Sequence, residues 1–421
     1  MTAKTKVAPS VVLGQEISKV FEGLFTQEQP VDSLVRLGAK LMLQSFVEWE
    51  ASKHLGREHY QRSQIEQNGW RNGYRNKLVH TADGQLDVKI PELRSTKQPF
   101  ESLLGEDRKV RTQTLERLAL MSYVKGLSVR DIEDLYKEGF GVESASINRT
   151  EMSQLSQKLG QEFDQWKKRP LDQMEILYLF LDAIYLPVRQ DSNEEEGILA
   201  AYGILGGGKR VLIHLALGNR ESYDNWMDFL RNMIGRGLRA PLMAISDGAP
   251  GLIKAIKHAF PRSLRQRCQA HKMRNLMKKL PRKVRGKLKA EIHEVFYAPT
   301  FDEGMNLGKA LIQRYKAVYL TAMECLEDDL ESCLMHMKFP QEHWKSIRTT
   351  NLMERTFEEG RRRTKVIPRF PSERSCLKLV YATLIDASKK WRGVRMSVSA
   401  IEQLNLMRDK LFGQAEQKMV S

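Results

Sequence analysis

Long apolar runs are absent from this chain of 421 residues. The longest, residues 176–186, is interrupted by Asp182 and is far shorter than the ~20 residues that a membrane-spanning helix needs. The N-terminus carries no apolar signal core. Cysteine is scarce, and its four copies follow no regular spacing, which excludes the disulfide framework of a small secreted domain. These absences predict a soluble, cytoplasmic protein with no membrane partner.

Acidic residues are also in short supply relative to basic ones. The chain holds 68 Lys and Arg against 52 Asp and Glu, a formal net charge of +16. An excess of this size is typical of proteins that bind a polyanion such as DNA. The hydrophobic fraction of 41% is that of a globular protein, so wholesale disorder is excluded and several domains are expected.

The N-terminal region predicts a helix and then a hairpin. Apolar residues recur at helical spacing up to about residue 55, and a polar stretch with several glycines follows. Alternation on either side of Asp83-Gly84 predicts a β-hairpin. Arg71 and Arg75 are interleaved with Trp70 and Tyr74, a pattern suited to phosphate contact and base stacking. An ordinary hairpin corner with two anchoring aromatics is the equal alternative.

Residues 110–159 predict two or three helices joined by short turns. Ser128 lies three residues before Asp131 and is expected to cap one helix, and the next is expected to begin at residues 144–146. This is helix-turn-helix spacing, which would place Asn148 and Arg149 near bases or phosphates of DNA. A plain helical hairpin has the same spacing and stays open as the alternative.

The second half begins with strands. Residues 176–186, 198–205 and 210–217 predict a three-stranded meander, a helix is expected from Ser222, and a strand at residues 242–245 ends before Asp247. The order β-β-β-α-β predicts an α/β fold. It matches the opening of an RNase H-like core, a mixed sheet with flanking helices.

Two carboxylates stand out in these strands. Asp182 lies in a strand that should be buried, where a lone carboxylate is costly unless it is paired or bound to metal. Asp247 ends an apolar strand, a position where α/β sheets build sites, although Asp-Gly is also a common turn. In the predicted order the two strands are neighbours. Both carboxylates could therefore face one site, and their oxygens suit Mg²⁺.

A third acid is expected from a helix that opens near residue 351. Glu354 follows Asn351 by three residues, which is also a capping-box pattern in which Glu354 would only satisfy a backbone amide. Read alone, the pattern favours the cap. A basic run, Arg361, Arg362 and Arg363, follows on the same helix; it suits phosphates but is also typical of a solvated face.

The most basic segment lies between residues 261 and 291 and contains twelve Lys or Arg and no acid. It also contains Cys268 and His271, and Cys333 and His336 repeat the same interval. A Cys2His2 zinc site is one reading of the two pairs. Buried cysteines with hydrogen-bonded histidines are the more common outcome.

Together these motifs resemble the Mutator-type transposases of the bacterial insertion sequence 256 family, over nearly the whole chain. The pieces that carry the resemblance, in order, are residues 69–75, 181–183, 246–248, 267–272 and 348–355. The resemblance implies a DDE transposase with an RNase H-like core, in which Asp182, Asp247 and Glu354 hold two Mg²⁺ ions that Mn²⁺ can replace. It also implies Cys268 and His271 as an accessory motif. Cys333 and His336 are not part of the pattern.

The resemblance further implies cleavage at terminal inverted repeats and strand transfer into target DNA, in the bacterial cytoplasm at the nucleoid, by a homodimer or larger assembly. Together with the residue patterns, it divides the chain into residues 1–109 at DNA ends, a helix-turn-helix-like domain at 110–172, core segments at 173–261 and 346–421, and a basic helical insertion at 262–345. The alternatives are a DNA-binding regulator and a structure-specific nuclease. The predicted DNA contacts are Arg71, Arg75, Asn148, Arg149, Lys272, Arg274, Lys278, Lys279, Arg282, Lys283, Arg361, Arg362 and Arg363.

Overall fold

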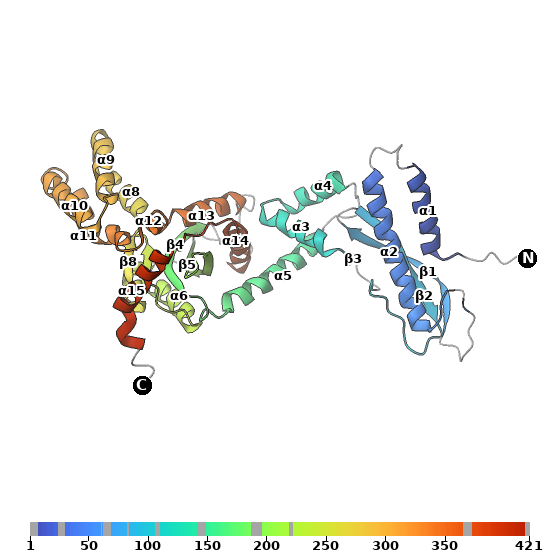
Figure 1. Ribbon diagram of the computed structural model, residues 1–421. Coiled ribbons are helices and arrows are strands. Elements are labelled where there is room, and N and C mark those ends of the chain that lie inside the picture. Colours follow the sequence, from blue (N-terminus) through green and yellow to red (C-terminus); the bar gives the residue numbers. More distant parts are fainter. Residues whose placement is uncertain are drawn as a thin grey trace, which may run out of the picture. The chain divides into compact units, whose positions relative to one another are not determined.

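The computed structural model describes most of the chain in two compact units, Met1–Ser156 and Gln157–Ser421 (Figure 1). The described residues are 7–23, 30–59, 61, 69–81, 84–105, 110–140, 149–186, 196–218, 222–364 and 373–416. Two predicted features lie outside these ranges. They are Asp83 of the predicted hairpin turn, and residues 144–146 with Asn148 at the predicted start of a helix.

The first unit opens with two helices, α1 (Pro9–Gly23) and α2 (Pro30–Leu55), and a small sheet. Strands β1 (Trp70–Thr81), β2 (Gly84–Arg94) and β3 (Val110–Arg111) are ordered β2-β1-β3, and β1 and β2 form the predicted antiparallel hairpin. Gln44 of α2 exchanges two 2.8 Å hydrogen bonds with the main chain of Lys89 on β2, which docks the helix on the strand.

Strand β1 is longer than the sequence predicts. It begins at Trp70, inside the polar stretch that is expected to precede the hairpin. The register between β1 and β2 shifts between Arg71 and Gly73, and Gly73 has a φ of 124°, which only glycine adopts readily. A bulge at this glycine therefore lets the strand extend through residues whose pattern looks irregular.

Helices α3 (Gln113–Val124), α4 (Val129–Phe140) and α5 (Arg149–Lys168) follow. The predicted cap at Ser128 is confirmed: its hydroxyl accepts from the Asp131 amide at 3.2 Å, and its own amide donates to the Asp131 carboxylate at 2.8 Å. Leu115, Ile132 and Tyr136 are fully buried between these helices, so the helical reading of this region is confirmed.

The second unit is built on a five-stranded mixed sheet. Its strands are β4 (Ile176–Leu186), β5 (Glu196–Leu205), β6 (Arg210–Gly218), β7 (Met243–Ser246) and β8 (Leu264–Arg267), in the order β6-β5-β4-β7-β8. The predicted antiparallel meander β4-β5-β6 is confirmed, and β7 pairs with β4 in parallel. Helices α6 (Tyr223–Gly235) and α7 (Pro250–Ala259) share one buried core with the sheet.

Strand β8 corrects one expectation. It lies inside the segment predicted to be a helical insertion from residue 262, and it pairs with β7 in parallel at the edge of the sheet. Its sequence, Leu-Arg-Gln-Arg, is too polar to be recognised as a strand from hydrophobic pattern alone. Helices begin only after it.

A group of helices with its own apolar core follows β8. It contains α8 (Gln269–Lys279), α9 (Arg285–Phe296), α10 (Phe301–Tyr315), α11 (Leu320–Leu334) and α12 (Gln341–Ile347), with 3₁₀ turns at Arg282–Val284 and Met335–Lys338. The unit ends with α13 (Asn351–Thr364), α14 (Glu373–Ser388) and α15 (Val398–Glu416). None of the described helices is long and apolar enough to cross a membrane.

Candidate active site

The parallel pairing of β4 and β7 brings the two predicted aspartates to one place. Leu181 on β4 is paired with Ser246 on β7, so Asp182 and Asp247 each follow a residue of the same pair. This confirms the predicted adjacency of the two strands. Asp247 lies at the carboxyl end of its strand, where its Oδ1 accepts from the Ala249 amide at 3.1 Å and so orders a tight turn.

Asp182 is the buried member of the site. Its side chain is 7% exposed; Oδ1 accepts from the Ala183 amide at 3.0 Å, whereas Oδ2 is buried without a hydrogen-bond partner. Burial above all raises the pKa of Asp182 to about 7, and the charges of Asp247 and Glu354 add to this rise while His271 opposes it. A carboxylate in this position is costly unless a proton or a cation neutralises it.

Glu354 reaches the same site from the first turn of α13. Arg274 Nη2 donates to both oxygens of Glu354, at 2.7 and 2.5 Å, and His271 Nε2 lies 3.0 Å from Oε1. Hydrogen bonds from His271 and Arg274 outweigh the effect of burial and lower the pKa of Glu354 to about 2. Glu354 is therefore ionised throughout the neutral range.

The capping-box alternative for Glu354 is wrong. Asn351 is the first residue of α13, and its side-chain oxygen is buried without a hydrogen-bond partner. The Glu354 carboxylate instead points to α8, where His271 and Arg274 lie on one face at a spacing of three residues. Thus the carboxylate is turned to α8 rather than to the helix start.

The predicted pair Cys268 and His271 lies beside Glu354. The buried sulfur of Cys268 accepts from the amide and the hydroxyl of Thr350, at 3.3 and 3.4 Å. Burial raises the pKa of the Cys268 thiol, but hydrogen bonds from His271 and Thr350 outweigh it and lower the pKa below the usual value. Burial disfavours the charged form of His271, but hydrogen bonds with Cys268 and Glu354 raise its pKa to about 10. The motif therefore holds a cation against Glu354.

Two carboxylates from other elements, Asp247 and Glu354, thus lie close enough to Asp182 for their charges to raise its pKa. Carboxylate oxygens are donors of the type that hard cations prefer, and the buried Asp182 Oδ2 has no hydrogen-bond partner in the protein. In the structure Glu354 is occupied by Arg274 and His271, and among the described residues no group of three or more His, Cys, Asp or Glu is arranged to hold a metal ion.

The Cys2His2 zinc reading is not supported. Cys333 is a buried free thiol, and the His336 ring packs edge-on against Trp344, with centroids 5.7 Å apart. Burial lowers the pKa of His336 to about 4, so it is a neutral core residue. His271 instead lies 3.0 Å from Glu354, and the Cys268 sulfur accepts from Thr350. Cys268, Cys325 and Cys333 are free thiols.

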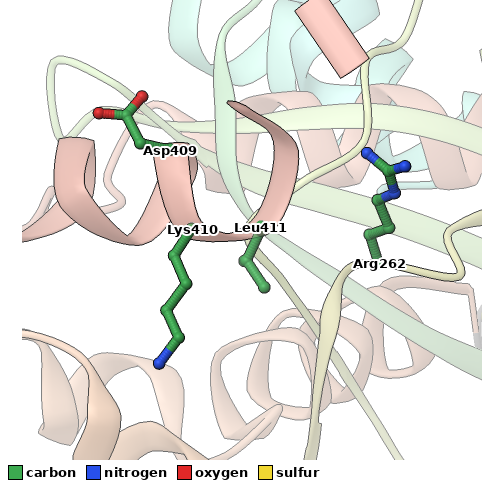
Figure 2. Close-up of a pocket in the computed structure, with 4 residues that line it drawn as sticks. All are labelled: Arg262, Asp409, Lys410 and Leu411. Atoms are coloured by element: carbon green, nitrogen blue, oxygen red, sulfur yellow. The ribbon is translucent and has the colours of Figure 1, made fainter. Parts of the chain in front are cut away.

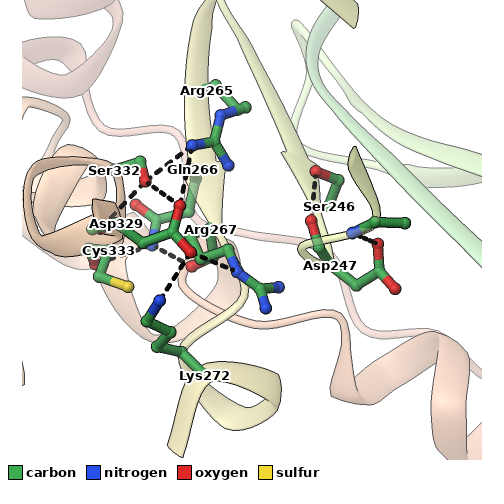
Figure 3. Close-up of polar contacts among 10 residues, drawn as sticks. Ser246, Asp247, Arg265, Gln266, Arg267, Lys272, Asp329, Ser332 and Cys333 are labelled. Atoms are coloured by element: carbon green, nitrogen blue, oxygen red, sulfur yellow. Dashed lines mark hydrogen bonds and ion pairs between the residues drawn. The ribbon is translucent and has the colours of Figure 1, made fainter. Parts of the chain in front are cut away.

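A cluster of charged residues that the sequence did not reveal lies next to the Asp247 turn (Figure 3). Asp329 of α11 binds Arg267 at 3.2 Å, Arg265 at 3.3 Å and Lys272 at 2.7 Å, and Ser332 donates to the Asp329 carbonyl. Lys272 is only 3% exposed. It is therefore an interior residue held by Asp329, and its predicted place on the DNA surface is wrong.

The other predicted DNA contacts occupy different environments. Arg71 is half-buried and donates to Ser52 at 2.9 Å and to main-chain carbonyls of the same unit, whereas Arg75 lies further along β1. Arg149 is the first residue of α5, and the side chains of Arg362 and Arg363 are outside the described part. Six of the predicted DNA contacts are exposed: Arg274, Lys278, Lys279, Arg282, Lys283 and Arg361.

An open cavity of about 540 Å³ lies elsewhere in the second unit. Its lining residues are Arg262, from the loop before β8, and Asp409, Lys410 and Leu411 of α15 (Figure 2). Because Arg262 precedes β8, this cavity is at the opposite end of the parallel strands from Asp247. It is separate from the carboxylates.

Comparison with known proteins identifies the family. The family model described as "Transposase, Mutator family" matches residues 15–393. The chain belongs to the Mutator family of transposases. It is 30% identical over 353 residues to the transposase for insertion sequence element ISRM5 of Rhizobium meliloti (strain 1021), covering 84% of this chain and 87% of that one.

Two further relatives show the breadth of the match. The transposase for IS6120 of Mycolicibacterium smegmatis is 34% identical over 272 residues, 65% of this chain and 84% of the relative. The transposase for IS256 in transposon Tn4001 of Staphylococcus aureus is 28% identical over 380 residues, 90% of this chain and 94% of the relative. The resemblance inferred from the motifs is confirmed, and this Mutator-family transposase matches its relatives along most of their length.

Proposed function

We propose that this transposase is a DDE enzyme that cleaves DNA at the terminal inverted repeats of an insertion sequence and joins the freed end to a target strand. The catalytic residues in this proposal are Asp182, Asp247 and Glu354, on an RNase H-like core interrupted by the helical group α8–α12. The observation that supports it is that Asp182 and Asp247 each follow a residue of the paired parallel strands β4 and β7, while the charge of Glu354 from α13 acts on Asp182.

The donor set fits Mg²⁺, which we propose that Asp182, Asp247 and Glu354 hold as two ions, with Mn²⁺ as a substitute. The fit rests on the buried, unpartnered Asp182 Oδ2 and on the charges of Asp247 and Glu354, which both raise the pKa of Asp182. Bound Mg²⁺ would stabilise the charge that develops on the scissile phosphate.

The chain's own residues have three tasks in this mechanism. Asp182 and Asp247 supply fixed oxygens, and Glu354 completes the set when it leaves Arg274. Arg274 is about half exposed, so its guanidinium can then turn to a DNA phosphate. Lys278, Lys279, Arg282 and Lys283 continue this basic surface along α8 and the following turn.

The chemistry consists of two in-line displacements at phosphorus. In cleavage, water forms a new P–O bond and the bond to the 3′ oxygen breaks, which leaves a 3′-hydroxyl. In joining, that hydroxyl attacks a target phosphodiester and forms a new P–O bond, and the bond to the target 3′ oxygen breaks. Solvent accepts the proton of the attacking hydroxyl and supplies one to the leaving oxygen. Two DNA ends imply a dimer or larger assembly at work.

The test is a cleavage and strand-transfer assay with labelled element-end DNA and Mg²⁺ or Mn²⁺. Glu354→Gln should abolish both products, while Glu358→Gln, an exposed position one turn later on α13, should retain them. Full activity of Glu354→Gln would overturn the triad. Binding without cleavage by the wild type under every metal condition would favour the DNA-binding regulator, and cleavage without joining would favour the nuclease.

A further inference from the structure

Arg267 is a buried arginine directly beside the Asp247 turn. It is the last residue of β8 and is paired in parallel with Ser246, the residue before Asp247. Its side chain is 3% exposed, and its Nε donates to Asp329 Oδ2 at 3.2 Å. The next amide, that of Cys268, donates to the Ser246 carbonyl at 2.8 Å, so the end of β8 is fixed against the end of β7.

The guanidinium of Arg267 lies against the backbone of Gly248. A methyl group on Gly248 would come within 2.3 Å of Nη2 and 2.4 Å of Cζ, closer than atoms approach in proteins. Arg267 Nη1 is buried without a hydrogen-bond partner. Figure 3 shows the free end of this guanidinium extending from Asp329 toward the turn that carries Asp247. Only glycine at 248 leaves room for this contact.

Asp329 keeps Arg267 in this position. It lies on α11, 62 residues further along the chain, and it also binds Lys272 at 2.7 Å and Arg265 at 3.3 Å. A buried guanidinium without a carboxylate is unfavourable, so Asp329 compensates the charge that Arg267 brings under the turn. The helical group thereby contributes a residue that supports the sheet edge.

We propose that Arg267, held by Asp329, is a positioning residue for the Asp247 carboxylate. The guanidinium forms the floor of the Asp247–Ala249 turn and fixes the direction in which the carboxylate leaves the strand. This inference rests on the proposed role of Asp247 in catalysis. Residues that orient metal ligands without touching the metal typically change metal affinity by about 10–100-fold when they are replaced.

The test compares Arg267→Met with Arg265→Met in the full-length protein. Both variants remove one cation from Asp329, but only Arg267 contacts Gly248. We expect Arg267→Met to raise the Mg²⁺ concentration for half-maximal cleavage roughly tenfold. It should also speed hydrogen exchange of the Gly248 and Ala249 amides, and Arg265→Met should change neither. Affinity for element-end DNA should stay within about twofold in both variants, since neither residue is on the exposed basic surface.

Gly248→Ala perturbs the same contact by adding a methyl group next to the Arg267 guanidinium, and it changes no charge. It should reproduce both the faster exchange and the higher Mg²⁺ requirement, and it provides the test if Arg267→Met does not fold. Equal exchange rates and equal Mg²⁺ requirements in Arg267→Met, Gly248→Ala and wild type would overturn the inference. Asp182→Asn separates the two proposals: if it cleaves normally, the proposed triad is wrong, whereas the exchange measurement still tests the positioning.

Discussion

The strongest prediction for stability concerns Asp329. This one carboxylate faces Arg265, Arg267 and Lys272, and the last two are each only 3% exposed. Asp329→Asn keeps the size of the side chain but leaves these buried cations without a carboxylate. Removing one partner of a buried ion pair typically costs about 3–5 kcal/mol, because an uncompensated charge stays buried. We expect the lower end, about 3 kcal/mol, because Asp329 itself is 17% exposed.

Scanning calorimetry measures this loss. For a unit of this size, about 3 kcal/mol lowers the melting temperature by roughly 6–12 °C. The control is Asp328→Asn, which removes the same charge from an exposed position on the same helix and should shift the melting temperature by about 1–2 °C at most. Equal melting temperatures for the two variants would refute the view that Asp329 compensates buried charge.

The pH dependence gives an independent check on the same residue. Burial raises the pKa of Asp329, but the hydrogen bond and charge of Lys272 and the charges of Arg267 and Arg265 outweigh it and hold the pKa below its usual value. A carboxyl with a depressed pKa stabilises the fold above its unfolded pKa of about 3.9, and this contribution is lost as the pH falls through the folded value. The difference in the free energy of unfolding between wild type and Asp329→Asn should therefore be fully present at pH 7 and become smaller below about pH 4.

Three further predictions concern catalysis, DNA binding and acid stability. Asp182→Asn should abolish cleavage and leave end-DNA affinity within about twofold in a gel-shift titration, because removing negative charge near phosphate does not weaken binding. The second variant replaces four exposed residues by Ala: Lys278, Lys279, Arg282 and Lys283. It should bind all DNA sequences more weakly, and the slope of log affinity against log salt should become shallower by about 0.9 for each phosphate that the variant no longer neutralises. Burial, with nearby arginines and a lysine, lowers the pKa of His214 from 6.5 to about 3. Below pH 6.5 the unfolded chain therefore binds a proton that the folded chain does not, which lowers the free energy of unfolding of the wild type by about 1.4 kcal/mol per pH unit. His214→Phe lacks this contribution, so urea unfolding should show a smaller loss of stability with falling pH in the variant.

The strand framework is predictable because its strands are apolar and its connections are short. Residues 176–186 and 242–245 are apolar enough to be recognised as strands, and the helix between them makes a parallel crossover the expected connection. That order alone places Asp182 next to Asp247. Strand β8 is not predictable in the same way, because two of its four residues are arginines and a polar edge strand carries little hydrophobic signal.

Contacts between distant residues are not predictable from local pattern. Sequence alone assigns Arg265, Arg267 and Lys272 to a basic segment, and their partner Asp329 lies about 60 residues away on another helix. Spacing along the chain cannot tell a solvated lysine from one that is neutralised in the interior. The i, i+2 spacing of Arg265 and Arg267 is the one available signal, since it places both side chains on the same face of a strand.

Glu354 follows a local sequence rule but makes its contacts with a distant helix. Its position three residues after Asn351 satisfies the rule for a cap, yet the Asn351 oxygen has no partner and the Glu354 carboxylate binds Arg274 and His271 on α8. A helix start that leaves a buried amide oxygen unpaired loses stability that a simple cap would keep. The turn therefore gives up local stability while the Glu354 carboxylate is oriented to α8, which is what the proposed catalytic role of Glu354 predicts. Arg274 and His271, the cations that hold Glu354, both lie on α8, a basic helix without acidic residues. In the proposed mechanism, DNA phosphates that attract Arg274 would therefore remove one of these two cations from Glu354 and leave His271 to orient it.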